Sequence, residues 1–426
     1  MNFHASHALI GGNIQRNVLI EIEDGRITAV VPSTPAGAAM RLRGLVLPGL
    51  ANVHSHAFHR VLRGHTHAGR GSFWTWRTRM YEVAAALDPD SYYLLARAVY
   101  GEMAMAGITA VGEFHYLHHA PDGARYNDPN AMGEALMAAA AEAGIRITLL
   151  DTLYLTSSAD GRPPEGVQVR FSDGSFDAWA ERVEALKPLP RALIGAAAHS
   201  VRAVPPADLA ALAGRSPLHI HLSEQRAENE QCQAVHGCTP TELVRRHGIL
   251  GPATTVVHAT HLTEADIAAL DGTGVCVCPT TERDLADGIG PARALTGLSL
   301  GSDSHAVIDL FEEARALEMD QRLATEERGH FTVAELVAAA TNHAAIGWPD
   351  AGAIEPGRRA DLVAVSLDSV RTAGADPAQA MLAATAADIT HVVADGRLIV
   401  DDSGHTGFDV ARALREAATA WKRSAA

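Results

Sequence analysis

The sequence lacks the segments that direct a chain into or across a membrane. No apolar run approaches the roughly 18 residues that a membrane-spanning helix needs. The first residues, MNFHASHALIGGNIQ, have no basic stretch followed by an apolar core, so we expect no signal peptide. We therefore expect a cytoplasmic protein that does not associate with membranes.

Basic residues are also scarce. The 426-residue chain has 35 Lys and Arg against 50 Asp and Glu, a formal net charge of −15. Such a chain is a poor partner for nucleic acid, because it offers few cations to neutralise phosphates. If its substrate is an anion, a few placed arginines must make the site locally positive.

Cysteine is rare, with four residues in the chain. Cys276 and Cys278 alternate in VCVCP, which is typical of a buried strand. The number and spacing favour reduced thiols over a disulfide framework or a zinc knuckle.

The two ends of the chain are rich in β-formers. The segment 17–32, NVLIEIEDGRITAVVP, predicts two strands joined by an Asp-Gly turn. Segments 360–367 and 390–402 repeat this pattern near the other end. We expect residues 1–47 and 352–426 to form one small β-sandwich domain.

The centre, residues 48–351, alternates apolar strands with alanine-rich helices such as 89–107 and 131–144. Eight such strands fit an α/β protein of the (β/α)8 TIM barrel type. A doubly wound open sheet is the rival, but no GxGxxG follows the first strand. The strand candidates are 45–54, 109–116, 146–155, 192–200, 217–224, 254–262, 275–282 and 298–305.

Polar residues cluster where these strands end, which is where barrel enzymes build their sites. His54 and His56 share one face of a strand, because side chains alternate with period two. His219 and His221 share a face in the same way, and spacing alone does not choose between them. Metal-binding chemistry is therefore expected at this end of the barrel.

Several motifs resemble a known family. LPGLANVHSH, HIHLSE, VHAT, GSDS and GAIEPGRRADLVAV are similar to the deaminase branch of the amidohydrolase superfamily. HAF-x-R, FWTWR, EFHYLHH, HSVRAV and LADGIGPA resemble more closely the formimidoylglutamate deiminases. That family hydrolyses N-formimidoyl-L-glutamate to N-formyl-L-glutamate and ammonia in histidine degradation.

The resemblance implies four zinc ligands. Three histidines and a carboxylate can hold zinc and leave room for a water. The segment after the fourth strand offers His199 and Arg202 where a bridging lysine would indicate two metals, so one Zn²⁺ per subunit is expected. Nitrogen and oxygen ligands also suit Fe²⁺ or Mn²⁺. The implied ligands are His54, His56, His221 and Asp303.

The same resemblance implies the residues that move protons. Asp303 would accept a proton from the attacking water while touching the metal. Glu224, three residues after His221, would act as the acid and base that shuttles protons to the departing ammonia. His258 would orient the water and stabilise the charge that develops at the reacting carbon.

The implied substrate is a small dianion, and its two carboxylates call for guanidinium partners. Arg77 lies in an aromatic stretch around 69–80, expected as a loop that could close over the site. Phe73, Trp74 and Trp76 are expected to pack this loop rather than contact the substrate. The substrate-contacting positions are His59, Arg77, Tyr116, His199 and Arg202.

His59 departs from the family, which has glutamine at this position. The departure bears on the identity of the substrate and hardly at all on the metal chemistry. One alternative is a deaminase of the same superfamily that acts on another amidine or on an aminated ring such as guanine, a cytosine-like base or an adenosine derivative. The other is a barrel without activity, but both the ligands and the proton-handling residues are present. A homodimer is implied by the resemblance alone.

Overall fold

The centre of the chain folds into a parallel barrel. A computed structural model describes residues 1–67 and 71–424. Each strand of the barrel pairs with the next along the chain, which confirms the predicted (β/α)8 barrel; an open doubly wound sheet would permute the order. The strands are β5 (Leu50–Ser55), β6 (Ile108–His115), β7 (Arg146–Leu153), β8 (Ala192–Ala198), β9 (Leu218–Leu222), β10 (Thr254–His258), β11 (Gly274–Val277) and β12 (Leu298–Leu300).

The first and last strands meet at what we call the seam, the junction between β12 and β5. Ser55 and Asp303 form a parallel bridge there. The Asp303 amide donates to the His54 carbonyl at 3.0 Å, and the His56 amide donates to the Asp303 carbonyl at 3.3 Å. These bonds continue beyond the end of the short β12, so the seam closes at the carboxyl end of the barrel.

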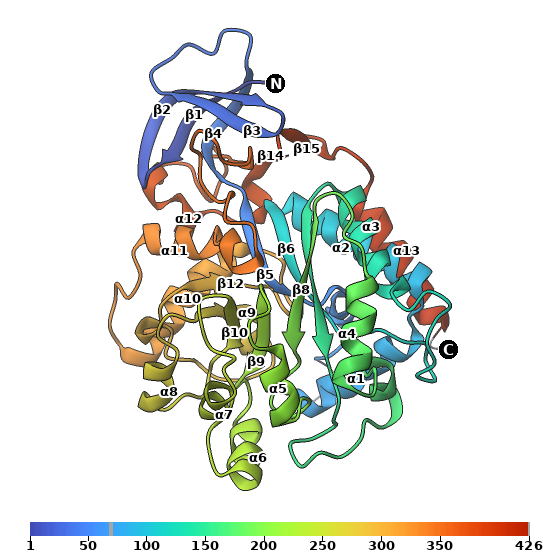
Figure 1. Cartoon of the computed structure of the whole chain (residues 1–426). Helices are drawn as coiled ribbons and strands as arrows, with labels where there is room; N and C mark the ends of the chain where they lie inside the picture. Colours follow the sequence, from blue (N-terminus) through green and yellow to red (C-terminus); the bar gives the residue numbers. More distant parts are fainter. Residues whose placement is uncertain (68–70, 425–426) are drawn as a thin grey trace.

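The helices surround the barrel, as Figure 1 shows. Those expected over 89–107 and 131–144 occur as α2 and α3. The α-helices are α1 (Phe73–Ala86), α2 (Pro89–Met105), α3 (Ala131–Ala143), α4 (Phe176–Ala185), α5 (Pro206–Leu212), α6 (Arg226–His236), α7 (Pro240–Arg246), α8 (Glu264–Ala269), α9 (Pro279–Asp284), α10 (Leu310–Thr325), α11 (Val333–Ala340), α12 (Ala380–Ala383) and α13 (Val410–Ser424). The 3-10 helices are η1 (Ala57–Leu62), η2 (Gly166–Phe171), η3 (Ala292–Ala294), η4 (His343–Ile346), η5 (Pro377–Gln379) and η6 (Ala386–Asp388).

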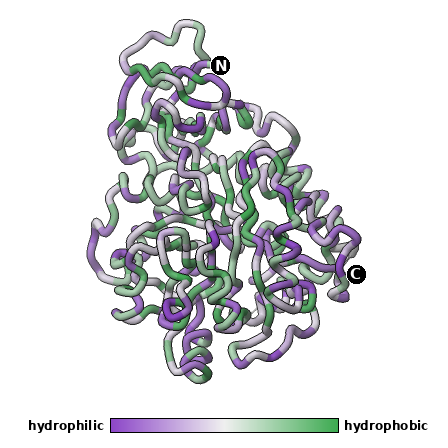
Figure 2. The backbone as a smooth tube through the Cα atoms, in the orientation of Figure 1, coloured by the Kyte–Doolittle hydropathy of each residue, from purple (hydrophilic) through white to green (hydrophobic). Residues whose placement is uncertain are grey.

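Hydrophobic residues follow the strands through the middle of the molecule, and hydrophilic ones gather in the outer loops (Figure 2). None of the described helices combines the length and the hydrophobicity needed to cross a membrane. All four cysteines are free and buried, as expected.

The two chain ends form a second sheet, at the top of Figure 1, in the order β16-β15-β14-β13-β4-β1-β2-β3. Both predicted hairpins are present, with turns at Asp24–Gly25 and Asp395–Gly396. This sheet is consistent with the expected small sandwich domain, whose limits at 47/48 and 351/352 remain a prediction. Its strands are β1 (Phe3–Ile10), β2 (Asn13–Glu23), β3 (Arg26–Val31), β4 (Met40–Pro48), β13 (Leu362–Val365), β14 (Ile389–Ala394), β15 (Arg397–Asp401) and β16 (Gly404–His405).

The segment 45–54 was expected as one strand, and this is wrong. Gly49 divides it, so that β4 belongs to the small sheet and β5 to the barrel. A side chain at Gly49 would clash with Thr109 and Asp361, since a Cβ there would lie 2.4 Å from the Thr109 Oγ1. The chain can pass between the two sheets only because this position has no side chain.

Charges fasten the small sheet to the amino ends of the barrel strands. Arg146 begins β7 and is fully buried. Its Nη1 donates to Asp361 at 3.0 Å and to Asp395 at 2.9 Å, so the guanidinium is paired on the side of the small sheet. The opposite end of the barrel, where the strands' carboxyl ends lie, is left for the candidate site.

Candidate active site

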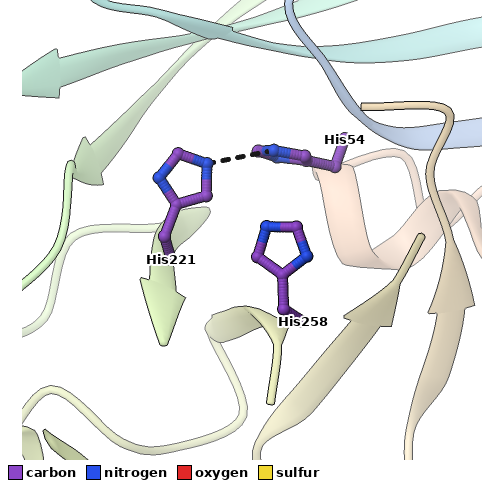
Figure 3. A group of neighbouring side chains, drawn as sticks. All are labelled: His54, His221 and His258. Atoms are coloured by element: carbon purple, nitrogen blue, oxygen red, sulfur yellow. Dashed lines mark hydrogen bonds between the residues drawn. The ribbon is translucent and has the colours of Figure 1, made fainter. Parts of the chain in front are cut away.

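The four predicted metal ligands converge at the carboxyl end of the barrel. The Nε2 atoms of His54 and His56 lie 3.3 and 3.4 Å from the Oδ1 of Asp303. The His221 Nε2 lies 3.1 Å from the His54 Nε2, and Figure 3 shows these two rings turned toward each other with His258 facing them from β10. Strands β5 and β9 and the loop after β12 thus deliver four donor atoms to one point.

The hydrogen bonds behind two of these rings fix their tautomers. The His56 Nδ1 lies 2.9 Å from the Phe114 carbonyl, and the His221 Nδ1 lies 2.9 Å from the His199 carbonyl. A carbonyl only accepts, so each Nδ1 carries the proton and each Nε2 presents a lone pair. Burial and the neighbouring His54 lower the pKa of His56 to about 3, so this ring is neutral.

These lone pairs face other acceptors. The unprotonated Nε2 of His56 faces a carboxylate oxygen of Asp303, and the Nε2 of His221 faces the ring nitrogen of His54. Burial would raise the pKa of Asp303, but the bond to His54 and the neighbouring histidines hold it well below its usual range. Several buried acceptors around one point need a cation between them, and a set of three histidines and one carboxylate suits zinc.

The second histidine of HIHLSE belongs to this cluster and the first does not. His219 lies on the same strand but is bonded to a different neighbour: its Nε2 is 2.9 Å from the carbonyl of Ala345. Because a carbonyl accepts, His219 is the donor in this pair. His221 thus lies beside His54, whereas His219 is turned to a backbone carbonyl, and the choice of His221 as a ligand stays a prediction.

Glu224 and His258 lie beside the metal-ligand cluster. The His258 Nε2 is 3.9 Å from both the Glu224 Oε1 and the Asp303 Oδ2. Burial raises the pKa of Glu224. Burial opposes protonation of His258, but Glu224, Glu282 and Asp303 outweigh it and raise its pKa well above the ordinary value. A buried carboxyl group and an imidazole, each with a raised pKa, therefore lie next to the candidate metal ligands.

Two acidic residues in this region were not predicted from the sequence. The Glu282 Oε1 accepts from the Cys278 amide at 3.0 Å and lies 3.6 Å from the His258 Nδ1, so it places a carboxylate behind that ring. Asp287 is hydrogen-bonded to Gln225, the residue after Glu224. Burial, with the charge of Glu224, raises the pKa of Asp287 to about 9. Glu282 ends the segment 275–282 that was expected as the seventh strand, and Asp287 lies in the motif LADGIGPA.

The five predicted substrate-contacting residues line one cavity together with the metal ligands His56, His221 and Asp303 and with Glu224. The cavity walls are also aromatic. Its lining includes Phe73, Trp76, Tyr81, Tyr154 and Phe171 in addition to His59, Arg77, Tyr116, His199 and Arg202. A small polar ligand can therefore reach the metal-ligand cluster and both arginines at once.

The expected loop around 69–80 is wrong from Phe73 onward, where α1 begins; residues 69 and 70 lie outside the described part. Phe73 and Trp76 line the cavity, contrary to expectation, whereas Trp74 is 48% exposed. Arg77 projects from this helix and its Nε donates to the Tyr81 hydroxyl at 2.7 Å. The guanidinium is thus held on a rigid element rather than on a loop.

The remaining substrate-contacting candidates come from other elements. The His59 Nε2 lies 3.1 Å from the Tyr116 hydroxyl, and both side chains are buried. The Arg202 Nε is buried and finds no hydrogen-bond partner among the described residues. A buried guanidinium nitrogen without a partner is costly, so this atom fits one that meets a ligand.

Beyond Tyr116, the EFHYLHH segment anchors its own loop. His118, Asp151 and His115 offer nitrogen and oxygen atoms within 4.8 Å of one another. However, Arg182 binds both carboxylate oxygens of Asp151 at 2.8 Å, and the His118 Nε2 is bonded to the Thr152 carbonyl. This arrangement already neutralises the carboxylate, so it fastens the loop to β7 and does not fit a metal.

An eight-stranded parallel barrel with histidines and a carboxylate at the carboxyl ends of its strands is the architecture of the metal-dependent hydrolases. Within that class the chain belongs to the amidohydrolase family, whose sequence profile matches residues 45–399. The expected superfamily is confirmed.

Individual relatives cover nearly the whole chain. Formimidoylglutamate deiminase of Pseudomonas aeruginosa is 37% identical, with 95% of each chain covered. The 8-oxoguanine deaminase of the same organism is 29% identical, with 92% of this chain and 91% of the relative covered. The crystal structure of an amidohydrolase from Brucella melitensis superposes with a TM-score of 0.89 at 30% identity, over 99% of both chains.

Proposed function

We propose that this chain hydrolyses N-formimidoyl-L-glutamate to N-formyl-L-glutamate and ammonia, as a step of histidine degradation. The observation that carries the proposal is that Arg77 and Arg202 both line the cavity that also contains the candidate metal ligands. In a chain of net charge −15, two arginines in one aromatic cavity favour a substrate with two negative groups. The likeness to formimidoylglutamate deiminase supports the same substrate.

The metal proposed for this site is one Zn²⁺ per subunit, held by His54, His56, His221 and Asp303. Iron or manganese would suit the same nitrogen and oxygen donors. When bound, such a metal supplies Lewis-acid activation of a water molecule.

The chain's own residues would move the protons. Asp303 receives a proton from the attacking water, whose oxygen forms a bond to the amidine carbon. Glu224 protonates the amidine nitrogen, and the proton held by Asp303 then passes to the same nitrogen. The C–N bond breaks and ammonia leaves, while the ionised Glu224 takes the proton of the new hydroxyl as the formamide forms. Both protons of the water thus leave with ammonia. His258, with the carboxylate of Glu282 3.6 Å behind it, would stabilise the charge that develops at the carbon.

The carboxylates of the substrate would bind at two places. On one side of the cavity, Arg77 on α1 works with Tyr116 and His59. On the other side, His199 and Arg202 follow β8. Because the two arginines lie on separate elements, the distance between them would select a dianion whose carboxylates are separated by a matching distance.

An aminated ring is the second candidate substrate. Trp76, Tyr154 and Phe171 give the cavity stacking surface, and 8-oxoguanine deaminase is among the relatives. This reading leaves Arg77 and Arg202 without a role in binding, so the dianion is favoured.

The setting in which the chain works is proposed as well. We infer a cytoplasmic enzyme that acts on a small molecule, with four reduced cysteines. Nucleic acid is not expected as a partner. A homodimer built from two barrels, each with residues 1–47 and 352–426 as its small domain, is the proposed assembly.

The direct test is ammonia release from N-formimidoyl-L-glutamate by the purified protein reconstituted with zinc. We expect one zinc per subunit by metal analysis, and turnover that is lost on chelation and regained on adding zinc. A protein that turns over 8-oxoguanine or guanine but not formimidoylglutamate would overturn the substrate assignment.

Replacing His59 by glutamine tests the departure from the family. The glutamine amide offers a donor and an acceptor at its end, whereas neutral His59 divides them between two ring nitrogens. We expect H59Q to lower KM for formimidoylglutamate by up to about tenfold, the value of one hydrogen bond, with kcat unchanged. His59→Ala is the matched comparison and should raise KM. If neither H59Q nor H59A changes KM, His59 does not contact the substrate; if H59Q raises KM as much as H59A, the amide cannot replace the imidazole contact.

A further inference from the structure

A buried chain of hydrogen bonds crosses the seam behind the metal-ligand cluster. The Ser55 Oγ donates to the Glu113 Oε2 at 2.6 Å and lies 3.1 Å from the His305 Nε2. The His305 Nδ1 lies 3.0 Å from the Ser302 Oγ, which accepts from the Asn52 Nδ2 at 2.7 Å. All five side chains are fully buried. From the sequence alone, His305 is expected either to support the ligands from behind or to lie in a loop.

The direction of every bond in this chain can be assigned. The Ser55 hydroxyl gives its proton to Glu113, so Ser55 must accept from His305, whose proton is then on Nε2. His305 is left with a lone pair on Nδ1, which accepts from the Ser302 hydroxyl, and Ser302 accepts in turn from Asn52. Donors and acceptors alternate without a conflict. Such a chain specifies one arrangement of the backbone segments that carry it.

These segments are the ones that carry metal ligands. Ser55 lies between His54 and His56, and Ser302 precedes Asp303. The other oxygen of Glu113, Oε1, accepts from the Ala57 amide at 2.6 Å, on the far side of His56. β5 and the loop after β12 are therefore tied to each other and to β6 on both sides of the ligands.

The seam needs such ties because ordinary strand pairing is short there. β12 has three residues, and Asp303 and His305 have left-handed φ values of 39° and 59°. Such a conformation costs a non-glycine residue free energy, so surrounding contacts must stabilise it. Arg63 supplies one more contact, since its Nε donates to the His305 carbonyl at 2.7 Å. Gly301 lets the two strands approach closely, since a Cβ there would lie 2.8 Å from the Cβ of His54.

We propose that His305 and Glu113 are positioning residues that hold His54, His56 and Asp303 in register across the seam. Neither side chain is in the candidate ligand set. They act by fixing Ser55 and Ser302, the neighbours of the ligands. This inference rests on the proposed metal site but not on the identity of the substrate.

The test measures zinc affinity by competition with a chromophoric chelator, together with the melting temperature of the metal-free and zinc-bound protein. We expect H305A to bind zinc roughly 10- to 100-fold more weakly, the usual effect of losing a group that orients ligands. H305Q should recover much of the affinity, because its amide nitrogen can replace the Nε2–H that donates to Ser55. His343→Ala is the matched control. His343 is an equally buried histidine at the amino end of the barrel, bonded to the Gly49 carbonyl, so its loss should lower the melting temperature but leave zinc affinity unchanged.

Glu113→Gln keeps the shape of the side chain and serves if H305A does not fold. Whichever way the amide is turned, its NH2 group faces either the Ala57 amide or the Ser55 hydroxyl, so the chain loses a bond or must reverse. We expect a loss of zinc affinity here as well. If both variants bind zinc as tightly as the unmodified protein, and only their melting temperatures fall, the positioning role is overturned. An unmodified protein that binds no zinc would overturn the metal site and this inference together, whereas zinc binding without turnover of formimidoylglutamate would overturn the substrate alone.

Discussion

Replacing Glu224 by glutamine is expected to lower kcat for formimidoylglutamate by about 10³-fold, within the range for loss of a positioned acid and base. The side chain is buried, lies 3.9 Å from the His258 Nε2, and has its pKa raised by burial. Glutamine keeps the size and polarity but cannot release or take up a proton. Because Glu224 is not among the metal ligands, E224Q should retain one zinc per subunit, and KM should change little.

The pH dependence gives a second readout for this variant. A raised pKa keeps the carboxyl of Glu224 protonated to a higher pH than an ordinary glutamate, so it can still donate a proton where exposed carboxyls are ionised. The unmodified enzyme should therefore lose activity as Glu224 ionises at high pH, and E224Q should lack this step in its residual rate. Glu230→Gln, the same change at an exposed position on α6, is the control and should have full activity. Full activity of E224Q with zinc bound would remove Glu224 from the mechanism.

Much of the barrel could be predicted because its signals are local. Eight apolar segments alternate with helices, and each becomes a strand in sequential order. The hairpins at Asp24–Gly25 and Asp395–Gly396 have turn residues whose conformations follow from their chemistry. The break at Gly49 was missed, since apolar residues continue on both sides of it and only the approach of Thr109 and Asp361 from other elements reveals it.

Helix α1 was mistaken for a loop although its start was readable. The Ser72 amide donates to the Thr75 Oγ1 at 2.9 Å, a bond typical of a helix start, and no proline or glycine follows until after the helix. The cluster of aromatic residues drew attention to packing instead. The consequence is functional, because a helix presents Arg77, Trp76 and Phe73 to the cavity with fixed spacing.

The grouping of the candidate ligands could be predicted from the sequence, but the residues that support them could not. His54 and His56 are two residues apart, and residues with this spacing on a strand point to the same face. His305 and Ser55 are 250 residues apart, so their bond depends on how the barrel closes. Glu282 reaches His258 from the element after the next strand in the same way. Contacts across a closed sheet follow from topology, which a single sequence specifies only indirectly.

Removing either arginine of the cavity should separate a dianionic substrate from an aminated ring. Arg77→Met and Arg202→Met keep the length and apolar character of the side chain but remove the charge. Each should lower kcat/KM for formimidoylglutamate by about 100-fold or more, because a carboxylate that enters a buried site without its guanidinium partner loses ~3 kcal/mol. The measurement is steady-state ammonia release, with formimidoylglutamate compared to a formimidoyl compound that has one carboxylate.

The compound with one carboxylate shows which arginine binds which carboxylate of the substrate. If each arginine binds its own carboxylate, one of the two variants should discriminate poorly between the dianion and the monoanion, since its lost partner is the group that the monoanion lacks. The other variant should keep a clear preference for the dianion, because the monoanion then meets neither arginine. Arg79→Met is the matched control on α1: Arg79 is exposed, pairs with Glu82 at 2.8 Å and points away from the cavity lining, so its loss should change kcat/KM by less than about twofold. Mild effects of R77M and R202M on formimidoylglutamate, with strong turnover of a purine, would mean that the aromatic walls and not the arginines recognise the substrate.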